Sequence, residues 1–190
     1  MGLLDFFTGG ADGQLKRHSK RATNLNAQAE DREASLQWLA QEGSEQAILG
    51  LLGRFSITYE HQMKDLNEKQ LVFELLEEMG GKVCGPIKVW SKTALQFARP
   101  LQLVDRFEGE EATVGLLLDL LEQENDPFKP EKKRQILIKL AEYTDDRIVP
   151  GIDDCLRDFD EGIRYAAVEA LLSQPDEGIR IALAQCIADD

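Results

Sequence analysis

The side chains that most often carry metal or acid–base chemistry are scarce in this chain. Its two histidines, His18 and His61, lie in a basic segment and a polar loop, and neither has a second histidine or cysteine three or four residues away. No Cys-x-x-Cys pair is present. Zinc sites need three or four such ligands at short, regular spacings. The sequence therefore predicts no metal site.

The candidate nucleophiles do not form a reactive centre either. Cys84, Cys155 and Cys186 each lie within or beside an apolar stripe. A thiol in such a position behaves as a small hydrophobic group. The glycine pairs at 9–10 and 80–81 lack the Gly-Lys-Ser/Thr sequence of a phosphate-binding loop. We therefore predict no catalytic residue and no cofactor, which favours a non-enzymatic protein and leaves the enzyme class open.

The charge balance narrows the range of partners. Among the 190 residues, 22 are Lys or Arg and 35 are Asp or Glu, so the formal net charge is −13. Residues 153–190 hold ten of the acidic side chains and three arginines. Such a surface repels the phosphates of nucleic acids and anionic lipids. The expected partner is a protein with a basic or amphipathic surface, and no nucleic acid.

The chain has the composition of a folded protein, with 43% apolar residues. It contains no run of about 18 apolar residues that would predict a membrane span, and its first residues do not resemble a secretory signal. Three widely spaced cysteines are typical of a reducing compartment. We expect a cytoplasmic protein, in which only residues 1–21, with their apolar start and basic cluster, leave a membrane contact open.

The elements that must position any site are helices. Apolar side chains recur at steps of three and four residues, the period of one helical face, whereas the alternation typical of strands is nearly absent. One such stripe predicts a single helix that carries Val83, Ile87, Trp90, Ala94 and Phe97 on its buried side. A second predicts a helix from Ile148 to Leu156. These patterns predict an all-α fold.

Breaks at 28- to 38-residue intervals separate the stripes, and they fall at Gly43, Gly81, Gly109, Asp145 and Asp176. This spacing is typical of helix–turn–helix repeats. We predict a right-handed α-solenoid within residues 25–190. Its hairpins are expected at about 25–60, 66–99, 100–123, 131–158 and 160–188. The apolar and basic segment 1–24 is expected to cap the first hairpin.

The last two hairpins resemble a known repeat. The segment 145–150, Asp-Asp-Arg-Ile-Val-Pro, opens one helix, and 160–164, Asp-Glu-Gly-Ile-Arg, opens the next. A turn aspartate followed by a helix with an early arginine is similar to the bacterial HEAT-like repeat, the type found in phycobilisome lyases. The likeness is closest over residues 131–188 and weaker over 25–123. It implies a protein-interaction adaptor or scaffold. A bilin-lyase-like or other small-ligand-binding protein is the alternative.

The residues predicted to contact a partner form two charged faces, one basic and one acidic, and include one aromatic side chain. Lys88, Lys92 and Arg99 lie opposite the stripe that begins at Val83, where a bilin would also find basic groups. An acidic face on the third and fourth hairpins holds Asp119, Glu122, Asp153, Asp154 and Asp158. Trp38 lies away from its helix's apolar stripe, and it either packs against a neighbouring segment or contacts the partner.

Glycine recurs early in four of the expected second helices, at Gly50, Gly85, Gly115 and Gly151. Within a helix, glycine costs about 1 kcal/mol relative to alanine. The recurrence therefore indicates a geometric need. Two explanations stay open. One is the close approach of a neighbouring helix or a kink beside Pro86 and Pro150, and the other is a row without side chains along a ligand-binding groove.

Overall fold

The structure, a computed structural model, describes residues 10–124, 130–174 and 179. In these ranges every regular element is an α-helix or a 3-10 helix, and no strand is present. The predicted all-α class is confirmed for this part of the chain. None of the helices described is long and apolar enough to cross a lipid bilayer.

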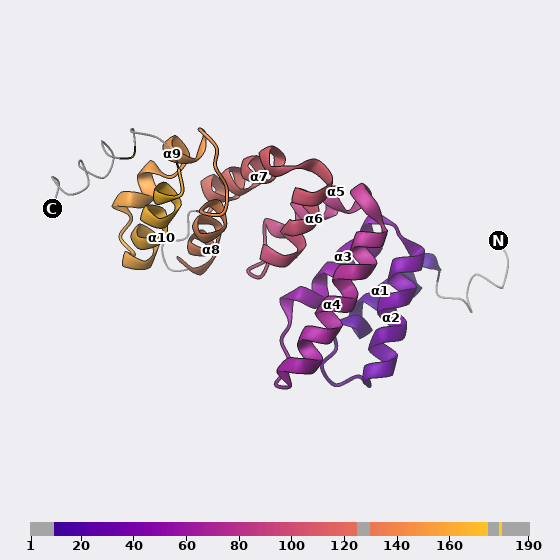
Figure 1. Cartoon of the computed structure of the whole chain (residues 1–190). Coiled ribbons are helices and arrows are strands. Elements are labelled where there is room, and N and C mark those ends of the chain that lie inside the picture. The colour runs from indigo at the N-terminus through magenta and orange to yellow at the C-terminus, as the bar shows by residue number, and fades with distance from the viewer. Residues whose placement is uncertain (1–9, 125–129, 175–178, 180–190) are drawn as a thin grey trace. The chain divides into compact units, whose positions relative to one another are not determined.

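The chain divides into two compact units, residues 1–107 and 108–190 (Figure 1). The division falls within the hairpin expected at 100–123, so that its two helices belong to different units. The single repeat domain expected over 25–190 stays a prediction.

Unit 1 holds six α-helices and two 3-10 turns within its described residues. They are α1 (Ala11–Ala22), α2 (Ala29–Glu42), α3 (Glu45–Leu52), η2 (Gly53–Ser56), α4 (Gln62–Glu78), η3 (Gly80–Val83), α5 (Cys84–Ser91) and α6 (Ala98–Glu108). The first three pack on one another, and α3 also contacts α4 and α5 (Figure 1). Their core is aliphatic, and Leu36, Leu51, Leu76 and Ile87 are fully buried in it.

The first hairpin turns where the sequence predicts, between α2 and α3. Gly43 adopts a left-handed conformation (φ 67°), and its N–H donates to the carbonyl of Leu39, which closes α2. The Ser44 hydroxyl then accepts a hydrogen bond from the Ala47 N–H and caps α3. The break predicted at Gly43 is confirmed.

The segment expected to cap the first hairpin forms α1, which packs on α2 and α3 and buries Ala22. Its Ser19 hydroxyl lies so close to Gly50 that a Cβ on that glycine would meet the oxygen at 2.5 Å. The described part, 10–24, thus packs on the first hairpin, and the role of segment 1–24 as a cap stays a prediction. The apolar residues at 3, 4, 6 and 7 lie outside the described residues, as do Cys186 and most of the fifth hairpin's second helix.

The single helix predicted from Val83 to Phe97 is wrong. Helix α5 ends at Ser91, and α6 begins at Ala98. Proline has no N–H for a helical hydrogen bond and is tolerated only in a first turn. Starting a new helix at Ala98 places Pro100 in that position, and Ala94 and Phe97 still reach the core from the intervening segment. Lys88 and Arg99 therefore do not share one helical face.

Unit 2 holds, among its described residues, α7 (Glu110–Gln123), α8 (Pro130–Leu140), α9 (Ile148–Gly151), η4 (Asp153–Arg157) and α10 (Glu161–Leu172). Helices α8 and α10 lie side by side, and α7 contacts α8 and α9 (Figure 1). Gly109, with φ 88°, precedes α7, at the break predicted there. The Asp160 carboxylate caps α10 by accepting the Ile163 N–H at 3.0 Å.

The helix predicted from Ile148 to Leu156 is also wrong as one element. It stops after four residues, because Ile152 leaves helical geometry (φ −112°, ψ 3°), and a 3-10 turn comes next. Glycine at position 151 weakens a helix at this point. The buried side chains are nevertheless those of the stripe, since Ile148, Ile152, Cys155 and Leu156 all face the core of unit 2.

Candidate functional site

Three of the predicted acidic contacts, Asp119, Glu122 and Asp154, line one cavity of unit 2. This Asp154 cavity has a volume of about 470 Å³ and lies between α7, α8 and the α9–η4 segment. Its other lining residues are Leu118, Leu121, Glu124, Lys133, Gly151 and Cys155. The acidic side chains thus come from two segments that are distant in sequence, and two leucines line the same cavity.

The remaining two predicted acidic contacts lie beside this cavity. The Asp158 carboxylate accepts a hydrogen bond from Lys133 Nζ at 2.7 Å and another from the Asp160 N–H at 3.0 Å. Burial opposes the ionised form of Asp158, yet these hydrogen bonds outweigh it and lower the pKa of the carboxyl group. Asp153 is exposed and pairs with Arg157 at 3.0 Å along the same turn.

The backbone of α9 approaches α7 closely at the floor of the Asp154 cavity. A Cβ on Gly151 would lie 2.6 Å from Leu118 Cδ2, which is too close for a real contact. Gly115 lies on α7 about one turn before Leu118 and faces Arg147. An added Cβ on Gly115 would lie 3.6 Å from Arg147 Nη1. The first of the two explanations for these glycines, close approach of a neighbour, therefore holds at Gly151.

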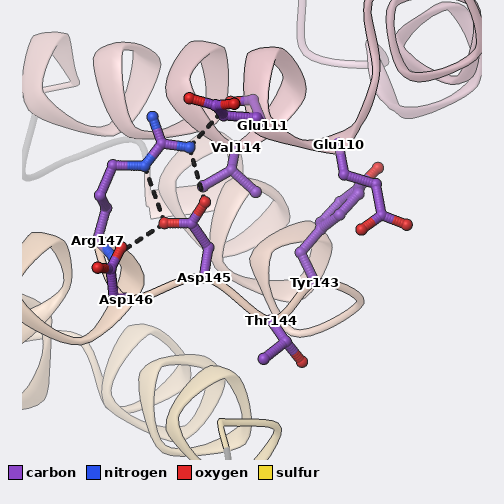
Figure 2. Close-up of a pocket in the computed structure, with 8 residues that line it drawn as sticks. All are labelled: Glu110, Glu111, Val114, Tyr143, Thr144, Asp145, Asp146 and Arg147. Atoms are coloured by element: carbon purple, nitrogen blue, oxygen red, sulfur yellow. Dashed lines mark hydrogen bonds and ion pairs between the residues drawn. The ribbon is translucent and has the colours of Figure 1, made fainter.

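A second cavity lies at the other end of α7 (Figure 2). This Asp145 cavity has a volume of about 430 Å³. It is lined by Glu110, Glu111 and Val114 of α7 and by residues 143–147, Tyr-Thr-Asp-Asp-Arg. One guanidinium, that of Arg147, connects its two walls.

Arg147 donates from Nε to Asp145 Oδ1 at 2.8 Å and from Nη2 to Asp145 Oδ2 at 2.7 Å. Nη2 also donates to the carbonyl of Glu111 at 3.0 Å, as Figure 2 shows. The hydrogen bonds from Arg147 hold the pKa of Asp145 at about 2, well below its usual 3.8. The turn aspartate singled out in the sequence therefore orients an arginine that ties the turn to α7.

The two cavities lie at opposite ends of α7 and are both strongly acidic, and we refer to their lining residues together as the acidic strip. Eight carboxylates and two bases line them. Both bases already bond to a carboxylate, Lys133 to that of Asp158 and Arg147 to that of Asp145. The strip therefore has an excess of negative charge that attracts cations and basic side chains.

A fully exposed aromatic residue lies in the loop between η4 and α10. Phe159 has all of its surface accessible and follows Asp158 directly in the chain. Arg164 Nη1 donates to the carbonyls of Asp158 and Phe159 at 2.9 and 3.1 Å, and this holds the loop in place. An exposed aromatic on an ordered loop is the kind of residue that dominates binding energy at interfaces.

The predicted contacts in unit 1 do not gather into one site. The Trp38 ring is half-buried and stacks on His18, with the ring centroids 4.2 Å apart. Arg99 donates to Gln70 and lies over the Phe73 ring. Lys88 is half-buried on α5, and Lys92 follows that helix on the surface. Trp90, which lies in the region where a bilin would find basic groups, packs edge-on against Phe55.

Within the described residues, no group of three His, Cys, Asp or Glu side chains is placed to hold a metal ion. Cys84 and Cys155 are buried free thiols. Burial raises the pKa of Cys155, so its thiol stays protonated and unreactive near neutral pH.

No family model, curated protein or solved structure matches the chain. Its function must therefore be inferred from the geometry of its own residues.

Several residues of the acidic strip were not picked out by the sequence analysis. Glu110, Asp146 and Lys133 each belong to a charged stretch that is common in this chain, and nothing in their spacing sets them apart. The available signal was the turn aspartate Asp145. Its proximity to Glu111 depends on the contact between α7 and α9, which belong to different predicted hairpins, so the sequence does not indicate it.

Proposed function

We propose that the chain is a non-enzymatic adaptor that binds a protein partner in the acidic strip along α7, with a basic, amphipathic segment of the partner as the ligand. The observation that carries this proposal is the convergence of Asp119, Glu122 and Asp154 on one cavity. The same cavity is lined by two apolar side chains, those of Leu118 and Leu121. Basic side chains would pair with the rim, while an apolar side chain would cover the leucines.

The finer features of this proposal rest on the sequence and on local geometry. We propose that the hairpins are HEAT-like repeats of a right-handed α-solenoid. The turn at Asp145, the cap at Asp160 and the side-by-side packing of α8 and α10 support this. A scaffold of the cytoplasm agrees with the free thiols of Cys84 and Cys155.

The test uses a fluorescein-labelled peptide of about 14 residues, the length of α7, with arginine on one helical face and leucine on the other. Binding is measured by fluorescence anisotropy. Replacing Asp119 and Asp154 together by lysine should lower the affinity about tenfold or more, because attraction becomes repulsion at two points. The Phe159→Ala variant should weaken binding without changing the melting temperature.

The matched control reverses two exposed carboxylates of unit 1, with Glu33→Lys and Glu74→Lys, and changes the net charge by the same amount. Equal losses in the two double variants would show a non-specific charge effect and would refute the strip as the binding site. A peptide with glutamate in place of arginine should not bind.

A further inference from the structure

Unit 1 contains a cavity of a different character from those along α7. This Arg32 cavity has a volume of about 420 Å³ and opens between two loops. The loop after α1 contributes Leu25 and Asn26, and the loop before α4 contributes residues 58–61. Arg32 from α2 and Lys64 from α4 complete it. Three of its lining residues, Arg32, His61 and Lys64, carry basic groups, and one, Glu60, carries a carboxylate.

A buried ion network forms the wall behind Arg32. Arg54 has no exposed surface and donates to Asp65 at 2.8 Å and to Glu68 at 2.9 Å. Arg32 Nη2 donates to the same Glu68 at 2.6 Å, and Lys69 pairs with Asp65 at 2.7 Å. Three bases thus share two carboxylates. These five side chains sum to one positive charge, and burying such a charge is costly unless an anion offsets it.

Tyr59 covers both guanidinium groups of this network. Its ring centroid lies 4.6 Å from the Arg32 guanidinium carbon and 4.4 Å from that of Arg54. Burial raises the pKa of the Tyr59 hydroxyl, and the Glu68 carboxylate of the network raises it further. An aromatic face stabilises a cation only partly and supplies no counter-charge. The ring therefore leaves the charge of the network unchanged, and only the exposed carboxylates Glu30, near Arg32, and Glu60, on the rim, offset part of it.

Arg32 also retains hydrogen-bonding capacity. A guanidinium has five N–H donors. In the part of the chain that the structure describes, Nε and one N–H of Nη2 bond to Glu68, and one N–H of Nη1 bonds to the carbonyl of Ala27. Two N–H groups, one on each terminal nitrogen, are left. The side chain itself is 93% buried, so its position is fixed, with 7% of its surface exposed.

The rim adds donors from the first turn of α4. His61 is the residue before this 17-residue helix, and its side chain makes no capping hydrogen bond within the described residues. Lys64 is exposed in the same turn. The N–H groups at the start of a helix and their partial positive charge favour an anion. The start of α4 therefore adds to the positive potential of the Arg32 cavity, but a helix start alone would not define a binding site.

We propose that the Arg32 cavity binds the phosphate group of a small molecule. A phosphate dianion can accept from the two remaining N–H groups of Arg32 and pair with Lys64 and His61 at once, whereas a carboxylate brings one charge and two oxygens. The volume of about 420 Å³ exceeds that of a phosphate alone and leaves room for an organic part. The site is independent of the acidic strip, because its residues all belong to unit 1.

The test is isothermal titration calorimetry of the full chain with inorganic phosphate and with glycerol 3-phosphate. Both should bind to wild-type protein, and Lys64→Gln should weaken each about tenfold, the loss of one charge-assisted contact. Arg32→Lys should abolish binding; its melting temperature reports whether the fold is kept. Tighter binding of glycerol 3-phosphate would show that the organic part also contacts the cavity, and equal affinities would show that the phosphate group alone is recognised.

The matched control is Lys20→Gln, which removes an exposed lysine of α1 outside the cavity. It should leave both affinities unchanged. The proposal is overturned if neither phosphate compound binds at millimolar concentration. It is equally overturned if Lys20→Gln and Lys64→Gln weaken binding alike, since the chain's overall charge would then explain the effect. Acetate at the same concentration should bind more weakly than either.

Discussion

At the scale of single residues, the packing of Trp38 depends on a titratable partner. The indole stacks on the His18 ring at an interplanar angle of 11°, and His18 Nδ1 lies 3.2 Å from the Ser35 hydroxyl. Burial lowers the pKa of His18 below 6.5, and the neighbouring charges of Arg17 and Arg21 lower it further. The neutral imidazole is therefore the form that the folded unit 1 favours.

Acidification should disturb this stack. The folded chain binds a proton at His18 less readily than the unfolded chain, so its contribution to stability is present above pH 6.5. It is lost as the pH falls through the lowered pKa. With Trp90→Phe, Trp38 is the sole tryptophan. Its fluorescence should fall with a midpoint below pH 6.5, because a protonated imidazole quenches indole emission.

The His18→Gln variant in the same background serves as the control and should show no transition between pH 7 and the onset of acid unfolding. A midpoint at or above 6.5, or a transition that persists without His18, would contradict the stacking. The result also matters for the prediction that Trp38 contacts a partner. If one face of the indole stacks on His18, only the opposite face can contact a partner.

At the scale of elements, the recurrent glycines differ in what they do. A Cβ on Gly50 would meet Ser19 Oγ at 2.5 Å and both Leu39 methyl carbons at 3.3 Å, and Leu39 is fully buried and cannot move away. Gly115 lies in the interior of α7, and its added Cβ would make only an ordinary contact with Arg147. Close packing therefore requires glycine at position 50 but not at position 115.

The two alanine variants should therefore have opposite effects on the free energy of unfolding. Gly50→Ala should destabilise the protein by about 1–3 kcal/mol through overpacking between α1, α2 and α3. Gly115→Ala should stabilise it by about 0.5–1 kcal/mol, because alanine is the better helix former. Urea unfolding followed by circular dichroism measures both. A loss of stability in both variants would indicate that α7 also needs the space at Gly115.

Helix class and buried faces were predictable because they depend on short-range periodicity. The stripe that begins at Val83 identifies Ile87 and Phe97 as core, and the cap at Asp160 is a local hydrogen bond. Where helices end was harder to predict. The break after Ser91 and the turn at Ile152 depend on how Pro100 and Gly151 fit against neighbouring segments, a tertiary constraint that a stripe does not contain.

The candidate site was predictable only in part, for the same reason. Asp119, Glu122 and Asp154 were selected as exposed acidic residues, and that they line one cavity is a consequence of α9 crossing close to α7. The ion network of Arg54, Asp65 and Glu68 gave no signal in the sequence. Its members lie in charged stretches, and only the fold of unit 1 buries them together.

At the scale of the whole chain, the formal net charge of −13 sets how salt affects stability and binding. Repulsion among like charges destabilises a compact state, and salt screens it over a Debye length of about 10 Å at 0.1 M. The same screening weakens attraction between the acidic strip and a basic segment. One salt series should therefore raise stability and lower affinity.

We expect the melting temperature to rise by several degrees, roughly 2–4 °C per kcal/mol of relieved repulsion, as NaCl increases from 10 to about 300 mM. Affinity for the arginine–leucine peptide should fall over the same range, mainly through slower association. In the Asp119→Lys, Asp154→Lys variant the melting temperature should depend less on salt, and the peptide affinity should lose most of its salt dependence. A wild-type affinity that does not depend on salt would show that the peptide binds through the leucines and not through the carboxylates. That result would exclude a basic segment as the ligand of the acidic strip.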